Sequence, residues 1–222
     1  MENVKERKGS LSRTRSIAFV GLTIAIMAVS AWVTVPLGPV PFTLQMFALT
    51  FAIVVLAPRE CIAAVTGYLL LGAVGVPVFS GMRGGIGVLA GPTGGFLWGY
   101  LLGAAAAALF LWVVRRRVGE KAPRGVQGGP AAGTGGSGAT AAGPVGAGAK
   151  VLLFLRDAGF ELVAGLLFTW ISYLCGWAQY MAVANVGPEA AFLTAIAPFI
   201  VVDMAKIVAA VICARAVRMA VR

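Results

Sequence analysis

The fold is decided by residues 76–95, which read Val-Pro-Val-Phe-Ser-Gly-Met-Arg-Gly-Gly-Ile-Gly-Val-Leu-Ala-Gly-Pro-Thr-Gly-Gly. From Phe79 to Gly95 there are seven glycines, one proline and a single charged residue, Arg83. An apolar run long enough for a membrane helix lies on each side. Glycine lets a backbone fold back and approach a small solute closely, so that its N–H groups face that solute. The stretch therefore predicts a binding loop between two membrane helices.

Composition indicates a helical membrane protein. Of the 222 residues, 59% are hydrophobic and only 12% are charged, whereas a soluble domain carries about 25% charged residues. Several apolar runs approach the length of roughly 20 residues that spans a bilayer. The run that follows residue 15 is too long for the apolar part of a signal peptide, so we expect it to be a retained helix.

Six membrane helices are predicted in an all-α fold. The apolar runs place them at about 16–35, 42–57, 60–78, 94–114, 159–183 and 191–214. The second run is short for a hydrocarbon core of roughly 30 Å, so we expect that helix to be broken or buried within the bundle.

The lysines and arginines predict the orientation. They gather before the first helix, after the second, after the fourth and after the sixth, which is one side of a six-helix chain; only Arg83 falls on the other side. The positive-inside rule then places both termini in the cytoplasm and the glycine-rich loop outside. Although the net charge is +10, we expect no nucleic-acid binding, because these residues end apolar runs and form no basic stripe with interleaved aromatics.

Two polar segments flank or interrupt this single membrane domain of residues 16–222. Residues 1–15 are expected to form a basic cytoplasmic tail. In residues 118–150, 22 of 33 positions are Gly, Ala or Pro and none is aromatic. Such a segment cannot bury enough apolar surface to order itself, so it predicts a disordered cytoplasmic linker.

Two charged residues lie inside the sixth predicted helix. A charge at mid-bilayer costs roughly 2.5–3.5 kcal/mol unless it is paired or hydrated. Asp203 and Lys206 are three residues apart, which puts them on one helix face. They are either a self-neutralising pair that anchors packing or a polar site for a solute with N–H donors and an anion. Pro198 favours the site, because a proline frees backbone carbonyls that are tolerated beside a hydrated cavity.

Other polar, small and aromatic residues are further candidates for packing or binding. Gln45 is either a helix–helix hydrogen bond or a ligand contact. Arg156, Asp157 and Glu161 are interpreted as a charge cluster at the cytoplasmic interface. Gly21 and Ala25 form a small-xxx-small pattern in the first helix, which favours close approach of another helix, either within the chain or from a partner subunit. Aromatic residues that could line a cavity are Trp32, Phe79, Phe96, Tyr173 and Trp177.

Several kinds of chemistry are excluded by what the sequence lacks. The chain has no histidine, which removes Ser-His-Asp catalysis, His-based zinc sites and histidine proton relays. It also has no phosphate-binding Gly-x-x-x-x-Gly-Lys-[Ser/Thr] motif, so any ATP must be used by other polypeptides. We expect no enzyme activity, metal or cofactor, with an intramembrane enzyme as the disfavoured alternative.

Three stretches together resemble the BioY family of biotin transporters, the S components of energy-coupling factor transporters. They are residues 35–45, residues 75–95, and the run Asp203-Met-Ala-Lys206. The resemblance implies a multi-pass protein of a prokaryotic cytoplasmic membrane, a six-helix bundle, and biotin bound near the outer face beneath the glycine-rich loop.

The resemblance also implies a set of ligand contacts. Asp203 suits the N–H donors of the biotin ureido ring, and either Lys206 or Arg83 suits its carboxylate. Leu97 stands where some members of the family carry an arginine. The predicted substrate-binding residues are Asp203, Lys206, Arg83, Gly84, Gly85, Gln45, Phe96 and Tyr173.

Partner subunits follow from the same resemblance. Gly21 and Ala25 occupy the positions of the Ala-x-x-x-Ala contact for a transmembrane coupling subunit, which would act with two ATPase subunits. Two alternatives remain open from the sequence. The chain could be an S component for another small vitamin, or it could transport biotin without coupling subunits.

Overall fold

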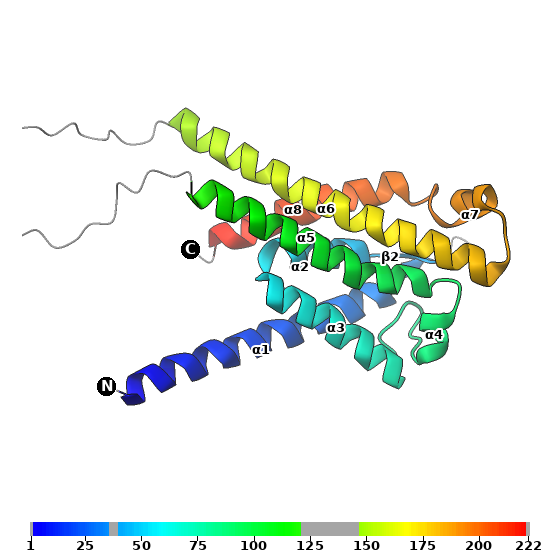
Figure 1. Ribbon diagram of the computed structural model, residues 1–222, viewed down its shortest axis with the longest axis horizontal. Coiled ribbons are helices and arrows are strands. Elements are labelled where there is room, and N and C mark those ends of the chain that lie inside the picture. Colours follow the sequence, from blue (N-terminus) through cyan, green and yellow to red (C-terminus); the bar gives the residue numbers. More distant parts are fainter. Residues whose placement is uncertain (1, 36–39, 121–146, 221–222) are drawn as a thin grey trace, which may run out of the picture.

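The computed structural model describes residues 2–35, 40–120 and 147–220, which form helices joined by short connections and one small sheet (Figure 1). The helices are α1 (Glu2–Trp32), α2 (Gln45–Val55), α3 (Pro58–Val74), α4 (Ile86–Ala90), α5 (Gly94–Glu120), α6 (Ala147–Ala184), α7 (Pro188–Ala195) and α8 (Ile200–Ala220). Strands β1 (Thr34–Val35) and β2 (Phe42–Thr43) pair antiparallel.

The all-helical membrane class is confirmed. Within the described ranges, three segments are long and apolar enough to cross a membrane: Arg13–Trp32, Gly94–Arg117 and Leu155–Ala184. Helices α7 and α8 make a fourth if the pair, bent by 48°, counts as one broken span. Because α2 and α3 have only 11 and 17 residues, they fall short of a typical span of about 20 residues, and the count of six stays a prediction.

The predicted helix boundaries differ from the structure at several places, including the start of α6 at Ala147 rather than at about 159. Helix α1 begins at Glu2, well before residue 16, so the expected tail is helical from that point. Helix α2 begins only at Gln45, because Phe42 and Thr43 pair with β1 instead. The sixth predicted helix is divided into α7 and α8 by a turn that contains Pro198, which has no N–H to continue a helix.

The glycine-rich stretch is an ordered loop against the end of α3. Helix α3 ends at Gly75, whose φ of 111° is left-handed, and the Gly85 N–H returns to the carbonyl of Gly72 at 2.6 Å. A short helix, α4, follows this turn and was not predicted. The Gln179 amide on α6 donates to the carbonyls of Leu89 and Gly91 at 2.8 Å each. The loop is therefore fastened to α3 and to α6.

Helices α5 and α6 lie side by side along most of their described length (Figure 1). Their contact depends on glycines four residues apart on α5. A Cβ added to Gly99 would lie 2.6 Å from the Ser172 Cα, and one added to Gly103 would lie 2.7 Å from the Phe168 carbonyl oxygen. Since no side chain fits there, glycine is what lets the two backbones come this close.

The molecule has two distinct ends. The beginning of α1 and the end of α8 lie at one end, and α4 and α7 lie at the other (Figure 1). Helix α5 continues to Glu120 and α6 begins at Ala147, so both edges of the predicted linker are helical. The rest of that linker, residues 121–146, lies outside the described residues, and its predicted disorder is not tested.

Candidate functional site

A pocket opens at the end of the molecule that carries α4 and α7. The space between its walls, with the open mouth included, is about 650 Å³. Residues far apart in the chain line it: Val40, Pro41, Thr43, Gln45, Met46, Phe79, Ser80, Arg83, Val88, Thr93, Phe96, Leu97, Tyr100, Tyr173, Ala195, Phe199, Asp203 and Lys206. Six of the eight predicted binding residues are therefore in one cavity.

Asp203 and Lys206 form a buried ion pair at the cavity wall. Their side chains are 5% and 8% exposed, and Lys206 Nζ lies 2.8 Å from Asp203 Oδ1. Tyr173 donates its hydroxyl to Asp203 Oδ2 at 2.6 Å. Each charge thus has a partner, which is what allows two charges to be held away from water. The pair lies in the first two turns of α8, where the helix dipole stabilises a carboxylate.

Lys206 is surrounded on its other sides as well. Its Nζ donates to the Thr43 carbonyl at 2.6 Å and lies 3.6 Å from the centre of the Phe42 ring. Phe42 in turn stacks on Phe199, with 6.3 Å between the ring centres. Strand β2 therefore supplies both a carbonyl and a ring to the ammonium, which fixes its position.

Gln45 makes a hydrogen bond between two helices and also lines the cavity. Its amide nitrogen donates to the Tyr68 hydroxyl on α3 at 2.6 Å, and that hydroxyl donates to the Val78 carbonyl at 2.8 Å. This is a helix–helix hydrogen bond that continues into the glycine-rich loop. The side-chain amide oxygen of Gln45, Oε1, accepts no hydrogen bond within the described residues, and Gln45 lines the cavity.

Arg83 is the exposed cation of the cavity lining. Its Nε donates to the Ser80 carbonyl at 3.1 Å, and its backbone carbonyl accepts from the Phe79 N–H at 2.9 Å. Ser80 approaches the Thr34 hydroxyl at 3.2 Å. The Arg83 Nη groups make no hydrogen bond within the described residues, so they are open to a ligand.

Gly84 and Gly85 do not line the cavity. A Cβ on Gly84 would collide with the backbone of Gly75 and Val76, and Gly85 has a left-handed φ of 98°. Both glycines shape the turn that carries Arg83. Leu97, which stands where some family members carry an arginine, does line the cavity.

The aromatic candidates divide into two groups. Phe79, Phe96 and Tyr173 line the cavity. Trp32 and Trp177 do not; their indole N–H groups donate to the carbonyls of Pro77 and Pro188 at 2.8 and 3.0 Å. The sequence reading missed Tyr100, Phe199 and Thr43, since nothing in the pattern separates a cavity aromatic from a core one and Thr43 contributes a backbone carbonyl.

The small residues of α1 also divide by face. Gly21 and Ala25 are exposed, and a Cβ on Gly21 would meet nothing within 4 Å. Ala28 and Ala31 are buried against the rest of the chain. Gly21 and Ala25 therefore make no close helix contact within the described residues.

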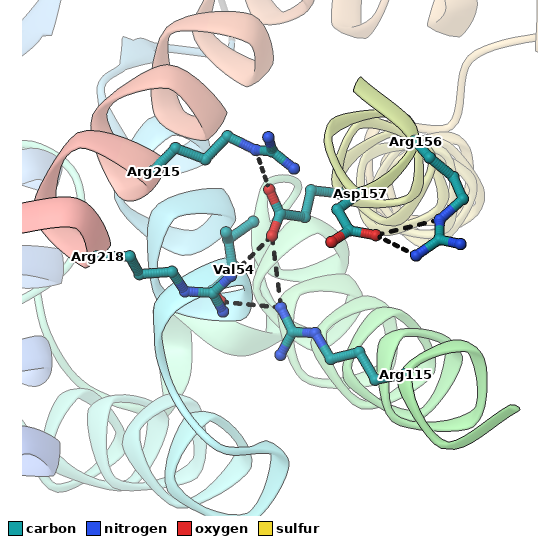
Figure 2. Close-up of polar contacts among 7 residues, drawn as sticks. Val54, Arg115, Arg156, Asp157, Arg215 and Arg218 are labelled. Carbon is teal, nitrogen blue, oxygen red and sulfur yellow. Dashed lines mark hydrogen bonds and ion pairs between the residues drawn. The ribbon is translucent and has the colours of Figure 1, made fainter. Parts of the chain in front are cut away.

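A second polar cluster, drawn in Figure 2, lies near the ends of α5 and α8, which are opposite to α4 and α7 in Figure 1. Glu161, whose side chain is 5% exposed, accepts from Arg215 Nε and Arg218 Nη1 at 2.7 Å each, and Arg115 Nη2 lies 3.5 Å away. Arg115 and Arg218 also donate to the Val54 carbonyl at the end of α2. Arg156 pairs instead with Asp157 at the surface, at 3.2 Å. The cluster interpreted from sequence is thus two separate groups.

Comparison with known families gives one match along nearly the whole chain. Residues 3–222 match the model of the BioY family. The "Biotin transporter BioY" of Thermotoga maritima is 47% identical over 95 residues, which cover 43% of this chain and 56% of that protein. "Biotin transporter BioY2" of Lactococcus lactis subsp. cremoris is 47% identical over 87 residues, covering 39% and 48%. The chain spans about half the length of these relatives.

A solved structure has the same fold. The crystal structure of the "S-component for biotin from an ECF-type ABC transporter" superimposes with a TM-score of 0.69, over 94% of this chain and 93% of that one. The two sequences are 18% identical, so this likeness concerns the arrangement of helices.

Proposed function

Because this chain belongs to the BioY family, we propose that it binds biotin in the cavity beneath the glycine-rich loop and carries it across the cytoplasmic membrane of a prokaryote as the S component of an energy-coupling factor transporter. The observation that carries this proposal is the buried group of Asp203, Lys206 and Tyr173 at the wall of an apolar cavity. Biotin has an apolar middle, with a ureido ring at one end and a carboxylate at the other.

The ureido ring of biotin suits the part of the cavity wall formed by Asp203 and Gln45. It offers two N–H donors and one carbonyl acceptor. Asp203 Oδ1 and Oδ2 each have a further lone pair beyond the bonds from Lys206 and Tyr173, and the Gln45 carbonyl is open to a donor. A hydrogen bond to a charged acceptor is stronger than one between neutral groups. We therefore place the ureido ring against Asp203, with Gln45 beside it.

The carboxylate suits Arg83. The Lys206 ammonium is already bound to Asp203 and the Thr43 carbonyl and covered by the Phe42 ring. The Arg83 Nη groups are open, exposed and on the loop side of the same cavity. With Leu97 in the lining, Arg83 replaces the arginine that some family members carry there, and Phe96 and Tyr173 bound the apolar middle of the ligand.

We infer six membrane segments, formed by α1, α2, α3, α5, α6 and the α7–α8 pair, with both termini in the cytoplasm. The burial of most of the short helix α2 supports its place as an internal segment. The beginning of α1 and the end of α8 lie at the same end of the molecule, as an even number of crossings requires (Figure 1). The intramembrane-enzyme alternative loses its basis, because the relatives are named as transporters.

Coupling would use the exposed face of α1. Gly21 and Ala25 leave room there for a second helix, which supports docking of a transmembrane coupling subunit that acts with two ATPase subunits. Expression in a biotin-auxotrophic host, with and without the three partner proteins, separates coupled from uncoupled uptake. We expect growth on trace biotin only when the partner proteins are present.

Equilibrium dialysis of labelled biotin with the purified chain tests the substrate. We expect saturable binding that excess thiamin or riboflavin does not displace. Asp203→Asn keeps the shape but loses the charge, and a charge-assisted hydrogen bond is worth about 1.5–3 kcal/mol, so affinity should fall at least tenfold. Asp157→Asn, the same change in an exposed surface pair, is the control. Absence of saturable biotin binding in a folded sample, or displacement by another vitamin, contradicts the proposal.

A further inference from the structure

The arginines at the inner end of α5 and α8 outnumber the carboxylates around them. Glu161 is bonded by Arg215 and Arg218 and lies 3.5 Å from Arg115. One carboxylate thus faces three guanidinium groups, and the neighbouring Arg156 is neutralised by Asp157 (Figure 2). The next residue on α5, Arg116, lies over the Trp112 ring at 3.9 Å. This group of side chains carries a positive excess.

Part of that excess is open to a ligand. The Arg115 side chain is 45% exposed and that of Arg218 is 34% exposed. Arg115 uses only its Nη2 in hydrogen bonds within the described residues, and Arg116 is exposed. Several N–H groups of Arg115 and Arg116 therefore point to no carboxylate or carbonyl of the described chain, in a fork geometry that suits a phosphate.

The position of the group corresponds to a lipid headgroup. Helix α5 rises about 1.5 Å per residue, which places Arg115 roughly 30 Å from Gly94, one hydrocarbon thickness from the outer end of the span. Exposed apolar side chains continue from it toward the membrane centre on both helices: Leu109, Trp112 and Val113 on α5, and Val208 and Ile212 on α8. An aromatic ring beside arginines is typical of the interface.

We propose that Arg115, Arg116 and Arg218 bind the phosphate of an anionic phospholipid, whose acyl chains lie along the exposed apolar residues of α5 and α8. The charge excess favours an anion. The apolar continuation favours a lipid over an acidic protein segment, because only a lipid presents a charge and acyl chains at that depth. The proposal does not depend on biotin.

Thermal unfolding of the full chain in a neutral detergent, without biotin, tests this. Phosphatidylglycerol should raise the unfolding midpoint saturably, and phosphatidylcholine should not. In the double variant Arg115→Gln, Arg116→Gln, the apparent affinity for phosphatidylglycerol should fall by roughly 10- to 30-fold, as expected for two arginines at an anionic surface. Glu161 keeps Arg215 and Arg218 in this variant, so it should fold. The matched control is Arg13→Gln, Arg59→Gln, which removes two exposed arginines of α1 and α3.

Four outcomes overturn the proposal. Equal shifts with both lipids would mean that charge does not select the lipid. An unchanged response to phosphatidylglycerol in the double variant would mean that these arginines do not bind it. An equal shift with inorganic phosphate at matched ionic strength assigns the group to a free anion. If the double variant loses coupling subunits on purification while its lipid response is intact, the group serves a protein partner instead.

Discussion

Lys206 and Arg83 are both cations of one cavity, but they differ in what already surrounds them. The Lys206 ammonium has three N–H groups, of which two bind Asp203 and the Thr43 carbonyl, and it lies against the Phe42 ring. A ligand carboxylate there would compete with Asp203 for the same charge. The Arg83 side chain makes one hydrogen bond within the described residues, to the Ser80 carbonyl of its own turn. The cost of reorganisation is therefore lower at Arg83.

The first prediction concerns this residue. Arg83→Gln should weaken biotin binding about tenfold, at the low end for a hydrogen bond to a charged group because the side chain is exposed. It should leave the affinity for biotinamide, which has no carboxylate, nearly unchanged. Equilibrium dialysis with both ligands measures this. Arg59→Gln, at the opposite end of α3, is the control. Equal losses for the two ligands would mean that Arg83 shapes the loop rather than holding the carboxylate.

Charged residues of the site could be predicted from the sequence, and aromatic ones only in part. A charge inside an apolar run demands a partner or water, which singled out Asp203 and Lys206. An aromatic residue makes no such demand, so Tyr100 and Phe199 had no signal that set them apart from core residues. Gly84 and Gly85 were expected to touch the ligand, yet they form the turn against α3. A glycine count cannot separate these two roles.

At the scale of the helices, α5 and α6 pack closely because glycines at their contact leave room for the two backbones to meet. Gly99 faces the backbone of Ser172, and Gly103 faces that of Phe168. Close backbone contact gives van der Waals energy that a lipid-exposed helix pair cannot gain from the hydrophobic effect. Phe96 and Tyr173, which line the cavity, lie on these two helices. The glycines therefore set the spacing of one cavity wall.

Gly99→Ala should lower the unfolding midpoint of the chain in detergent. The added Cβ would be 2.6 Å from the Ser172 Cα, so the helices must separate, and overpacking of this kind costs about 1–3 kcal/mol. Gly159→Ala makes the same change on α6 where nothing lies within 4 Å; it should be neutral or stabilising by about 0.5–1 kcal/mol, because alanine is the better helix former. If both variants unfold at the same temperature, close packing at Gly99 is not needed.

Element types could be predicted better than element ends. Apolar runs located the long helices α5 and α6, because a span of about 20 apolar residues has few alternatives. The sixth helix was predicted as one run, and Pro198 indicated freed backbone carbonyls but not the division into α7 and α8. Helix α4 was missed, since its five residues lie among glycines that favour turns. Helix α2 begins later than predicted because Phe42 and Thr43 pair with strand β1, which comes from an earlier part of the chain.

At the scale of the whole molecule, the exposed face of α1 is separated from the ligand cavity. Gly21 and Ala25 are exposed, and neither lines the cavity. Gly21→Leu should therefore leave biotin affinity within about twofold, while its bulk blocks close helix approach and abolishes both co-purification of coupling subunits and coupled uptake.

Gly159→Leu is the matched control, because it adds the same side chain at another exposed helical glycine with open space around it. It should retain coupled uptake. Loss of biotin binding in Gly21→Leu would show that this face packs within the chain. Normal co-purification would show that the coupling subunit docks elsewhere.

Glu161 links several helices at the end of the molecule that lies opposite the cavity. It connects α6 to Arg115 on α5 and to Arg215 and Arg218 on α8, and two of these arginines also bind the Val54 carbonyl of α2 (Figure 2). Three helices thus meet at one carboxylate, and the arginines connect it to a fourth, α2. Helix α2 ends after 11 residues, which leaves carbonyls without helical partners, and the arginines satisfy one of them.

Glu161→Gln should destabilise the fold strongly because it removes the one carboxylate among these guanidinium groups. Loss of one partner from a buried ion pair costs about 3–5 kcal/mol, and we expect the low end, since Arg115 and Arg218 are partly exposed. The unfolding midpoint should fall by roughly 10 °C. Asp157→Asn breaks a surface pair whose side chains are 40% and 57% exposed, so it should cost at most about 1 kcal/mol. Biotin affinity of the folded Glu161→Gln protein should be retained, because the cavity is formed at the other end. Equal midpoints for the two variants would mean that helix packing alone, without this carboxylate, holds this end of the molecule together.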